Sequence, residues 1–502
     1  MREAPRQPVK AEPHVVGGAA AFVPASPQSP ARCGLQRGLS GSPWLPFRFR
    51  MNPASEFLSR HGVVADGSRT CTRELQSAID AAAREGGHLV FPPGVYRSGT
   101  LELRSRMLLE LLPGAVLQAS SDLADYPAIA PGTEHKDRQP YQFLRCVGAA
   151  SVAIRGGGRI DGAGPSFWHP EPGPWGWYRE LAARPCPMVL FEDCEDLSLD
   201  GVEIANSPGW TLHLLRCRRV AIRGVTIRNN LFGPNTDGID IDGCSDVRVS
   251  DCRIEAGDDA VVVKSSADAG PSERILVTNC SIATNCRALK LGAFESFHPM
   301  RQVVFSNCVV EQSVAVFGLY SRNGAVLEDI AVSNIVGNAF SNRDYNQPIH
   351  IDLARHSDDR PRGAIRNVTV DNMVCRTNGR VLLTAEPGSV VERVRLRGIT
   401  LVLEDRFDPY PGGLTARGNQ FSPRSAEARA ARAAIVADSL RDLTVSDCAI
   451  DWQGAGDPPF HAFWGRALCG GGIDADGLRG SAPGLPTVAL TDCDGFGVRN
   501  AG

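Results

Sequence analysis

The chain has 502 residues and a formal net charge of −3, and 43% of its residues are hydrophobic. This content supports a substantial core, whereas the near-neutral charge gives no bias toward nucleic acid or an anionic membrane. Aromatic residues make up only 7%, while 52 glycines and 35 prolines favour many short elements joined by turns, and no apolar run is long enough to span a membrane.

Residues 1–50 differ in composition from the rest of the chain. They contain eight prolines and seven lysines or arginines, but only two acidic residues, Glu3 and Glu12. No amphipathic period is visible, so we expect a disordered tail, or an over-long start that precedes a true start at Met51. The basic start and immediate apolar core of a signal peptide are missing. No export signal is evident, which favours a cytoplasmic location, and we treat residues 51–502 as a single domain.

The first regular element expected is a helix over Thr72–Gly87. Leu75, Ile79, Ala82 and Ala83 fall on one stripe of this segment, and the two glycines at its end are a stop signal. A helix at this place is predicted to cap the N-terminal end of the repeat structure that follows and to hide its first coil.

Cysteines mark a loose repeat through the middle of the chain. Cys194 and Cys217 are 23 residues apart, and Cys252, Cys280 and Cys308 follow one another at 28 residues. Short runs with alternating apolar residues lie between them, separated by Asn, Asp or Gly. A repeat of about 20–50 residues indicates a solenoid, and the lack of an amphipathic helix in each unit disfavours leucine-rich and helical repeats. The pattern predicts an all-β fold, a parallel β-helix.

The same pattern returns at residues 364–375, 391–403 and 440–452, so the solenoid is predicted to continue nearly to the C-terminus. Residues 424–440 are a second helix candidate, in the chain or in an inserted loop. The fifteen cysteines suggest repeated structural positions more than a secreted disulfide framework. Since neither a CxxC pair nor a His/Cys cluster is present, we expect no structural zinc site.

Two acidic motifs stand about one coil apart. The stretch NTDGID contains Asp237 and Asp240, and the stretch GDD contains Asp258 and Asp259. Asp237 and Asp258 are 21 residues apart, so stacking of coils would place them on neighbouring strands. Adjacent residues of a regular strand point to opposite faces. For Asp258 and Asp259 to face one cleft the backbone must turn or bulge, which Gly257 could permit.

Such carboxylates have three readings. Taken singly, each motif is more often a turn or a solvated loop, and a carboxylate cluster can also bind calcium. The third reading is hydrolysis of an acidic glycoside, in which one carboxylic acid protonates the leaving oxygen and another carboxylate activates water. Crowding of like charges can keep one of them protonated. Arg287 and Lys290, one coil further on, would supply cations.

Several motifs together resemble glycoside hydrolase family 28, the polygalacturonase family. The likeness runs from about Phe57 to Ile335 and includes the opening segment HGVVADGSRT, the glycine-rich GGGRIDGAG, NSPGWTLHLLRC, NTDGID and GDDAVVVKS. The resemblance implies a right-handed parallel β-helix that hydrolyses α-glycosidic bonds of pectic polymers with inversion. It implies a pectic oligo- or polysaccharide as partner, and no cofactor or metal.

The resemblance also implies roles for single residues. Asp258 is similar to the general acid, and Asp237 and Asp259 are similar to the pair that positions and deprotonates water. Asn235 is similar to the polar residue that accompanies them. Two further residues are weaker candidates: Lys264, in the matching DDxxxxKS context, would brace the carboxylates, and His213 would line the cleft.

Two departures from the family pattern concern the substrate. Cys286, Arg287 and Ala288 stand where the family has a Gly-His-Gly segment, and the Arg-Ile-Lys segment of the next coil is missing. Arg287, Lys290 and Arg322 are candidate replacements for the lost cations, since guanidinium groups pair well with carboxylates. We therefore predict action on galacturonosyl or rhamnogalacturonan-type substrates.

Three alternatives stay open, one of which is a sugar transferase or epimerase on the same scaffold. A pectate lyase has the same fold but performs β-elimination, normally with calcium and a basic arginine. A non-catalytic glycan-binding β-helix would carry the aspartates incidentally. The one-coil spacing of the two acidic motifs argues against this non-catalytic alternative.

Overall fold

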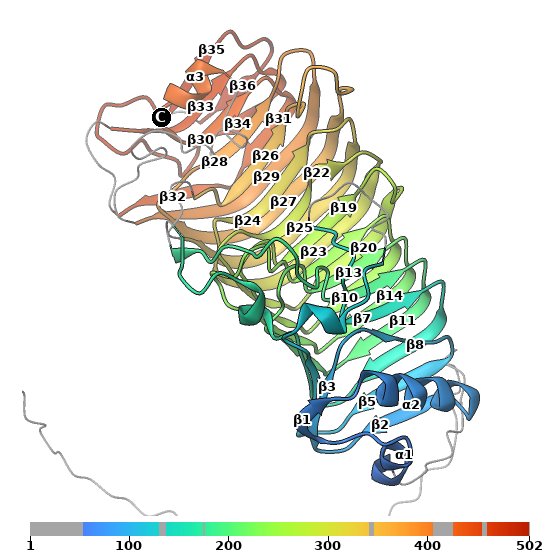
Figure 1. Ribbon diagram of the computed structural model, residues 1–502. Coiled ribbons are helices and arrows are strands. Elements are labelled where there is room, and N and C mark those ends of the chain that lie inside the picture. The colour runs from blue at the N-terminus through green and yellow to red at the C-terminus, as the bar shows by residue number, and fades with distance from the viewer. Residues whose placement is uncertain are drawn as a thin grey trace, which may run out of the picture. The chain divides into compact units, whose positions relative to one another are not determined.

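The computed structural model describes residues 54–129, 137–173, 176–340, 346–404, 425–453 and 459–500. The predicted disordered tail lies outside these residues. The described residues belong to one unit, Phe49–Gly502, and the single-domain boundary at residue 51 stays a prediction. Among the described strands, every strand-to-strand pairing is parallel, as predicted for a right-handed parallel β-helix. Successive coils lie side by side, from the helices α1 and α2 to the strand β36 (Figure 1).

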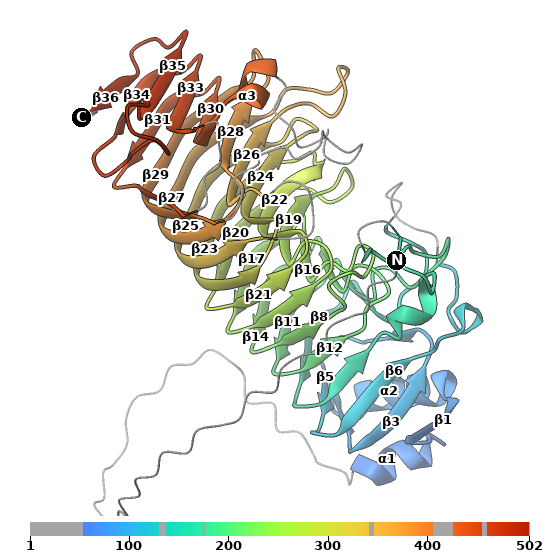
Figure 2. The same ribbon diagram turned by 90° about the vertical axis from the view of Figure 1, so that its left-hand side faces the viewer.

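One wall of the solenoid is a 13-stranded sheet to which each coil contributes one strand. Figure 2 shows part of this stack, from β16 to β35. In chain order its strands are β4 (Leu101–Glu102), β7 (Leu144–Val147), β10 (Val189–Glu192), β13 (Leu212–Leu215), β16 (Ile239–Asp242), β19 (Val261–Ser265), β22 (Arg287–Ser296), β24 (Ala315–Ser321), β26 (Ile349–Leu353), β28 (Val381–Ala385), β30 (Ala433–Asp438), β33 (His461–Arg466) and β35 (Val488–Thr491). We call it the site sheet, because the predicted acidic residues lie at its strands.

The remaining strands form a 23-stranded sheet that makes the other walls. Its strands are β1 (Asp66–Thr70), β2 (His88–Phe91), β3 (Gly94–Ser98), β5 (Met107–Leu111), β6 (Ala115–Ala119), β8 (Ala150–Arg155), β9 (Arg159–Asp161), β11 (Glu195–Asp200), β12 (Glu203–Ala205), β14 (Arg218–Arg223), β15 (Thr226–Arg228), β17 (Ser245–Ser250), β18 (Arg253–Ala256), β20 (Ser272–Thr278), β21 (Ser281–Thr284), β23 (Met300–Gln312), β25 (Val326–Ala339), β27 (Ala364–Thr377), β29 (Val390–Leu403), β31 (Arg441–Ser446), β32 (Ala449–Trp452), β34 (Cys469–Asp474) and β36 (Gly497–Arg499). From β23 to β29 one long strand replaces two short ones, because β20 and β21 both pair with β23.

The repeat seen in the cysteines is a repeat of buried corner positions. Cys252, Cys280 and Cys308 are each at most 3% exposed, and each thiol donates to the carbonyl two residues before it. The fourteen cysteines among the described residues are all free. This agrees with the predicted structural role, since a stacked ladder needs the same small apolar side chain at the same place in each coil.

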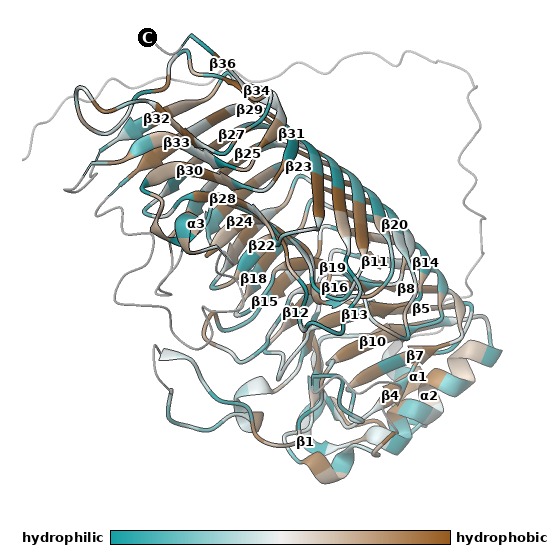
Figure 3. Ribbon diagram, turned by 90° about the horizontal axis from the view of Figure 1, so that it is seen from above, coloured by the Kyte–Doolittle hydropathy of each residue, from teal (hydrophilic) through white to brown (hydrophobic). Residues whose placement is uncertain are grey.

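Asparagines form a second ladder at the outer corners. Asn307, Asn334 and Asn372 have left-handed backbones, with φ of 54°, 55° and 51°. Their side chains hydrogen-bond along the stack, Asn334 to Asn307 at 2.9 Å and Asn372 to Asn334 at 2.8 Å. Asparagine tolerates this conformation better than other residues with a Cβ. In Figure 3 the brown, apolar colour is concentrated on the strands rather than at the corners.

The N-terminal helix is confirmed as α2, Thr72–Arg84, and a short helix α1, Ala54–Arg60, precedes it. Leu75, Ile79 and Ala82 of the predicted stripe are buried, and α2 contacts the first strands of the solenoid. Two 3-10 turns follow, η1 at Leu123–Asp125 and η2 at Gly164–Phe167. Among the described residues, no helix has both the length and the apolar character that a membrane crossing requires.

The second helix candidate, residues 424–440, is wrong in extent. Only α3, Ala426–Ala430, is helical, and strand β30 occupies Ala433–Asp438. Ala434, Ile435 and Ala437 of this strand lie in the central core. Burial in a continuing parallel sheet therefore outweighs the helix propensity of the alanines.

Candidate active site

Three successive coils bring the predicted carboxylates together on the outer face of the site sheet. The strands β16, β19 and β22 are adjacent; β16 pairs in register with β19, and β19 pairs with β22 in register as far as Val263. The backbone of Gly238 donates to the Asp259 carbonyl, and that of Ala260 donates to the Arg287 carbonyl, both at 2.9 Å. Asp237, Asp259 and Arg287 thus form one column at the N-terminal ends of the three strands. The two acidic motifs therefore lie on neighbouring coils, as their spacing of 21 residues led us to expect.

Close approach of two loops explains the glycine before the Asp258–Asp259 pair. A Cβ on Gly257 would lie 2.4 Å from both the Gly233 carbonyl and the Thr236 hydroxyl. The Gly257 amide donates to that hydroxyl at 3.0 Å. The sequence suggested that Gly257 permits a turn or bulge, and among the described glycines it is not one with positive φ. Its role is to let the two acidic loops touch.

Asp258 and Asp259 differ in their surroundings. Asp258 is half-buried, while Asp259 is 4% exposed. The ammonium group of Lys290 contacts the Asp259 carboxylate, and the Arg287 amide donates to it at 3.3 Å. Burial by itself raises the pKa of Asp259, but the charges of Lys290 and Arg287 outweigh burial and lower it. Asp259 is therefore held as a carboxylate.

Asp237 and Asp240 show the opposite balance. Burial raises the pKa of Asp237 well above its usual range, and the charge of Asp240 raises it further, although Lys264 opposes both. One Asp237 oxygen, Oδ1, is buried without a hydrogen-bond partner. Burial also raises the pKa of Asp240 to about 6, even though the Lys264 ammonium lies 2.7 Å away. Protons are therefore retained here to higher pH than on ordinary carboxyls.

Lys264 is the cation that supports this acidic pair. Its ammonium group lies 3.7 Å from the Asp237 carboxylate and 3.3 Å from the centre of the Trp210 ring. The side chain is 2% exposed, and the carboxylates around it overcome burial and raise its pKa. This arrangement agrees with the bracing role suggested for Lys264.

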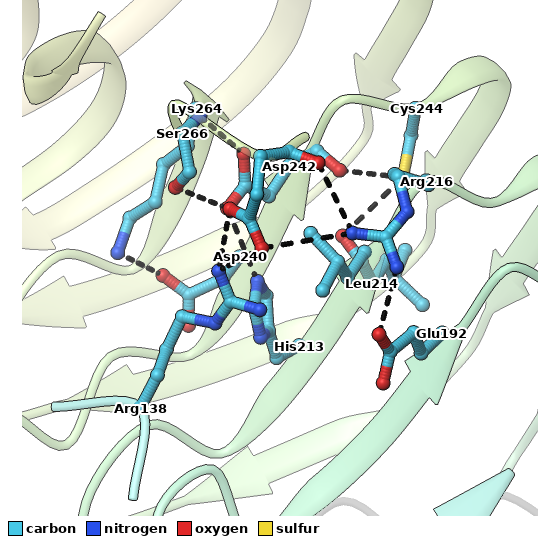
Figure 4. A network of polar contacts seen from close by, with 12 residues as sticks. Arg138, Glu192, His213, Leu214, Arg216, Asp240, Asp242, Cys244, Lys264 and Ser266 are labelled. Atoms are coloured by element: carbon cyan, nitrogen blue, oxygen red, sulfur yellow. Dashed lines mark hydrogen bonds and ion pairs between the residues drawn. The ribbon is translucent and has the colours of Figure 1, made fainter. Parts of the chain in front are cut away.

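His213 lies behind the acidic cluster. It is fully buried, and its ring is 5.2 Å from the Trp210 ring and 3.4 Å from Asp242. Burial lowers the pKa of His213 to about 4, which the Asp242 carboxylate only partly offsets. Ser266 also donates to Asp242, and Figure 4 shows this network beside the Lys264–Asp240 pair. His213 is thus in the neighbourhood predicted for it, but with no exposed surface.

The three candidate cations separate in the structure. Lys290 joins the carboxylates through Asp259. Arg287, 3% exposed, donates to the Cys286 thiol at 3.0 Å and to the Tyr320 hydroxyl at 3.4 Å. Arg322 comes directly after the following strand, β24, and pairs with Asp352 at 2.5 Å. Arg322 is therefore held in a separate ion pair.

Asn235 is held by an arginine that the sequence did not single out. The Arg184 guanidinium is fully buried and lies 3.4 Å from the Asn235 side-chain oxygen, to which it donates. It also donates to the carbonyls of Pro208 and Pro234 at 2.8 and 2.7 Å. Arg184 thus ties the loop that precedes Asp237 to the coil before it. No sequence spacing indicates this contact, because Arg184 lies in an irregular loop.

Asp240, Trp210 and Glu295 are further candidates to which the sequence assigned no role. Asp240 had a detectable signal, since Ile239 and Ile241 on either side of it face the core and alternation turns Asp240 outward. Trp210 contacts Lys264 from a loop, and Glu295 lies in the irregular part of β22. No periodic pattern exists for either segment.

Asp258, Asp259 and Cys286 place potential metal-ligand atoms within 4.8 Å of one another. Lys290 contacts Asp259, and Arg287 donates to the Cys286 sulfur. Because two cations already neutralise this group, its donor set fits a metal ion poorly.

The arrangement can supply both halves of acid–base chemistry. Asp259 is held ionised, whereas Asp237 binds a proton more tightly than usual. Asp258 is the most exposed of the three and can reach a ligand. Carboxyl groups whose environments differ in this way are a common basis of glycoside hydrolysis.

Comparisons with known proteins agree with this geometry. A family model described as glycosyl hydrolases family 28 matches residues 125–403. A probable polygalacturonase of Vitis vinifera is 34% identical over 218 residues, which cover 41% of this chain and 43% of that protein. An exopolygalacturonase of Zea mays is 23% identical over 60% of this chain and 70% of that protein. The chain thus spans less than half the length of the grapevine relative.

Solved structures show the same fold. The exopolygalacturonase of Thermotoga maritima superposes with a TM-score of 0.57 at 23% identity, over 69% of this chain and 86% of that one. The family 28 exopolygalacturonase of Yersinia enterocolitica gives 0.62 at 15% identity, over 89% of this chain and 78% of that one.

Proposed function

Because the chain belongs to glycosyl hydrolases family 28, we propose that it is an inverting hydrolase of α-linked galacturonosyl bonds in pectic poly- or oligosaccharides. The candidate substrates are polygalacturonan-type and rhamnogalacturonan-type chains. The observation that carries the proposal is the convergence of Asp237, Asp258 and Asp259 with Lys264 and Lys290 on three successive coils.

Asp258 acts as the general acid. It is the most exposed of the three carboxyl groups, so it can approach the glycosidic oxygen of a chain lying on the site sheet. The Asp258 carboxyl donates its proton to that oxygen as the bond to the anomeric carbon breaks. General acid catalysis of this kind contributes about 10²–10⁴-fold to the rate.

Asp259 and Asp237 act on the attacking water. Lys290 and Arg287 keep Asp259 ionised, which suits it to orient water and take up its proton. The raised pKa of Asp237 makes this group a stronger base once it has lost its own proton. The water oxygen bonds to the anomeric carbon on the face opposite the leaving oxygen, so the configuration is inverted.

The test is product analysis by mass spectrometry with the wild type and Asp258→Asn. Polygalacturonan and rhamnogalacturonan oligosaccharides are incubated with each protein. Hydrolysis of one bond yields two products whose summed mass exceeds that of the substrate by one water. We expect the variant to lose turnover by about 10³-fold while it keeps its circular dichroism spectrum. Asn matches Asp in size, so a lost fold is not the expected cause.

Two outcomes would contradict the proposal. Unsaturated products that absorb in the ultraviolet would indicate β-elimination, as in a lyase. Binding without any turnover by the wild type would indicate a non-catalytic glycan-binding protein.

A further inference from the structure

Two loops on neighbouring coils lead into the site. Residues 206–211 precede β13 and carry Trp210; residues 229–238 precede β16 and carry Asp237. We call them the Trp210 loop and the Asp237 loop. The Lys264 ammonium lies between them, 3.3 Å from the centre of the Trp210 ring and 3.7 Å from the Asp237 carboxylate. The distance between the two loops therefore determines how Asp237 and Lys264 meet.

One buried arginine joins the two loops. The Arg184 side chain has no exposed surface. A single nitrogen of its guanidinium, Nη1, donates to the Pro208 carbonyl at 2.8 Å and to the Pro234 carbonyl at 2.7 Å. Pro208 belongs to the Trp210 loop and Pro234 to the Asp237 loop. Because both carbonyls bind the same nitrogen, they cannot move apart without losing a hydrogen bond.

The second guanidinium nitrogen, Nη2, holds the residue that follows Pro234. It donates to the side-chain oxygen of Asn235 at 3.4 Å and lies 3.3 Å from the Asp137 carboxylate. Asn235 has a left-handed backbone, with φ of 50°, a conformation that asparagine tolerates better than most residues. Arg184 thus holds two consecutive residues of the chain that runs into Asp237.

The segment that follows Arg184 fastens the Trp210 loop a second time. The Met188 amide donates to the Trp210 carbonyl at 2.7 Å, and the Trp210 amide donates to the Cys186 sulfur at 3.2 Å. A Cβ on Gly209 would lie 2.4 Å from that sulfur and 3.3 Å from the Arg184 Cζ atom. The Trp210 loop therefore lies directly against residues 184–188, without room for a side chain between them.

An arginine at this position is expensive for folding. Its Nε atom is buried without a hydrogen-bond partner, and removing a guanidinium from water costs several kcal/mol. An apolar side chain of similar volume would fill the same space without that penalty. What Arg184 adds is a set of donors that holds the backbone of both loops.

We propose that Arg184 is a positioning residue of the acid–base centre: by bridging the Pro208 and Pro234 carbonyls it sets the position of Asp237 relative to Lys264. Arg184 acts through the two loops and not by contact with a ligand. The inference rests on the proposed function where it concerns turnover, whereas its effect on the loops can be measured without any substrate. A misplacement of about 1 Å in a catalytic group can lower the rate by about 10²-fold.

The test compares Arg184→Met and Arg184→Lys with the same two substitutions at Arg380. Arg380 is a matched control, because it is 1% exposed and also donates to two backbone carbonyls, those of Ala431 and Ala428, at 2.6 and 3.2 Å. Those carbonyls belong to the segment of α3. Urea unfolding measures stability, hydrogen exchange by mass spectrometry measures the opening of each loop, and steady-state kinetics separate kcat from KM.

We expect Arg184→Met to speed hydrogen exchange in residues 229–238 and to lower kcat by about 10²-fold, with KM little changed. Arg184→Lys keeps the charge and one donor nitrogen, so it should recover part of both effects. Arg380→Met should lower the urea midpoint as well, because it leaves two carbonyls without this donor. It should speed exchange in residues 425–432 and leave kcat close to that of the wild type.

Two results would overturn the inference: unchanged exchange in residues 229–238 of both Arg184 variants, or a fall in kcat that is equally large in the Arg380 variants. If Arg184→Met does not fold, the two lysine variants decide the question by the same comparison. Faster exchange in residues 229–238 of an enzyme whose wild type shows no turnover would count against the hydrolase proposal and leave the loop-holding role of Arg184 in place.

Discussion

Two groups of buried charges lie on the outer face of the site sheet, and they are built differently. In the first, on β16 to β22, Asp237 has a buried oxygen without a hydrogen-bond partner and acids outnumber cations. In the second, on β24 to β28, Arg322 contacts one oxygen of Asp352 and Thr384 donates to the other, both at 2.5 Å. The first group contains a carboxyl oxygen without a hydrogen-bond partner, where a ligand can act. In the second group both Asp352 oxygens already have partners. Buried charge alone does not identify a site; a cluster of carboxyl groups that includes a buried oxygen without a partner is the feature that points to one here.

Asp237→Asn should give the largest effect, and on activity rather than stability. Burial and the Asp240 charge already disfavour the ionised form of Asp237, so an uncharged Asn of the same size should leave the free energy of unfolding unchanged or higher. The loss of the group that acts on water should lower kcat by about 10²–10⁴-fold. Steady-state kinetics and urea denaturation of the purified variant measure the two quantities. A stability loss that accompanies the activity loss would remove the distinction between the two groups.

Asp352→Asn should show the reverse pattern. It leaves the Arg322 guanidinium, 2% exposed, without the carboxylate that neutralises it. Breaking one partner of a buried pair costs about 3–5 kcal/mol of folding free energy. The midpoint of urea unfolding should fall accordingly, while kcat at low temperature stays near that of the wild type. A strong fall in kcat with normal stability would place Asp352 in the site.

The smallest effect concerns two carboxyls of strand β16 with opposite pKa shifts. The folded state raises the pKa of Asp240 to about 6, so the stability from this group is present at low pH and is lost as the pH rises from about 4 through 6. Burial raises the pKa of Asp242 too, but His213 and Ser266 outweigh it and lower it. Its stability is present above the unfolded pKa and is lost as the pH falls.

Thermal unfolding between pH 3 and 7 tests this difference. In the wild type, Asp240 should lower the free energy of unfolding by on the order of 2 kcal/mol as the pH rises from 4 to 6, and this fall should be absent in Asp240→Asn. Asp242 should lower the free energy of unfolding as the pH falls, and this effect should be absent in Asp242→Asn. The same pH slope in both variants would contradict the assignment of opposite shifts.

Much of the fold could be predicted from the sequence, because a solenoid repeats one local rule. Alternation in short runs determines which side chains face the core, and the cysteine spacing gives the length of a coil. The helix candidate at residues 424–440 was wrong because this segment shows neither the alternation nor the cysteine spacing of a coil. Its alanines favour a helix locally, but β28 offers a parallel edge that buries Ile435 and its neighbours.

The catalytic candidates were also accessible to sequence reasoning, while their partners were not. Asp237, Asp258 and Asp259 stand in short motifs one coil apart, and the resemblance to a family gave their roles. The sequence offered Arg287, Lys290 and Arg322 as equivalent cations. The structure assigns Lys290 to Asp259 and Arg322 to Asp352.

The sequence by itself determined the coil repeat, the inward and outward faces of the strands and the acidic motifs, because each depends on residues close together in the chain. Only the tertiary structure decided which charges meet, how deeply they are buried and where strand β22 bulges. Coils of unequal length and a bulge in β22 set the register between neighbouring strands, and charge interactions depend on that register over a few ångströms.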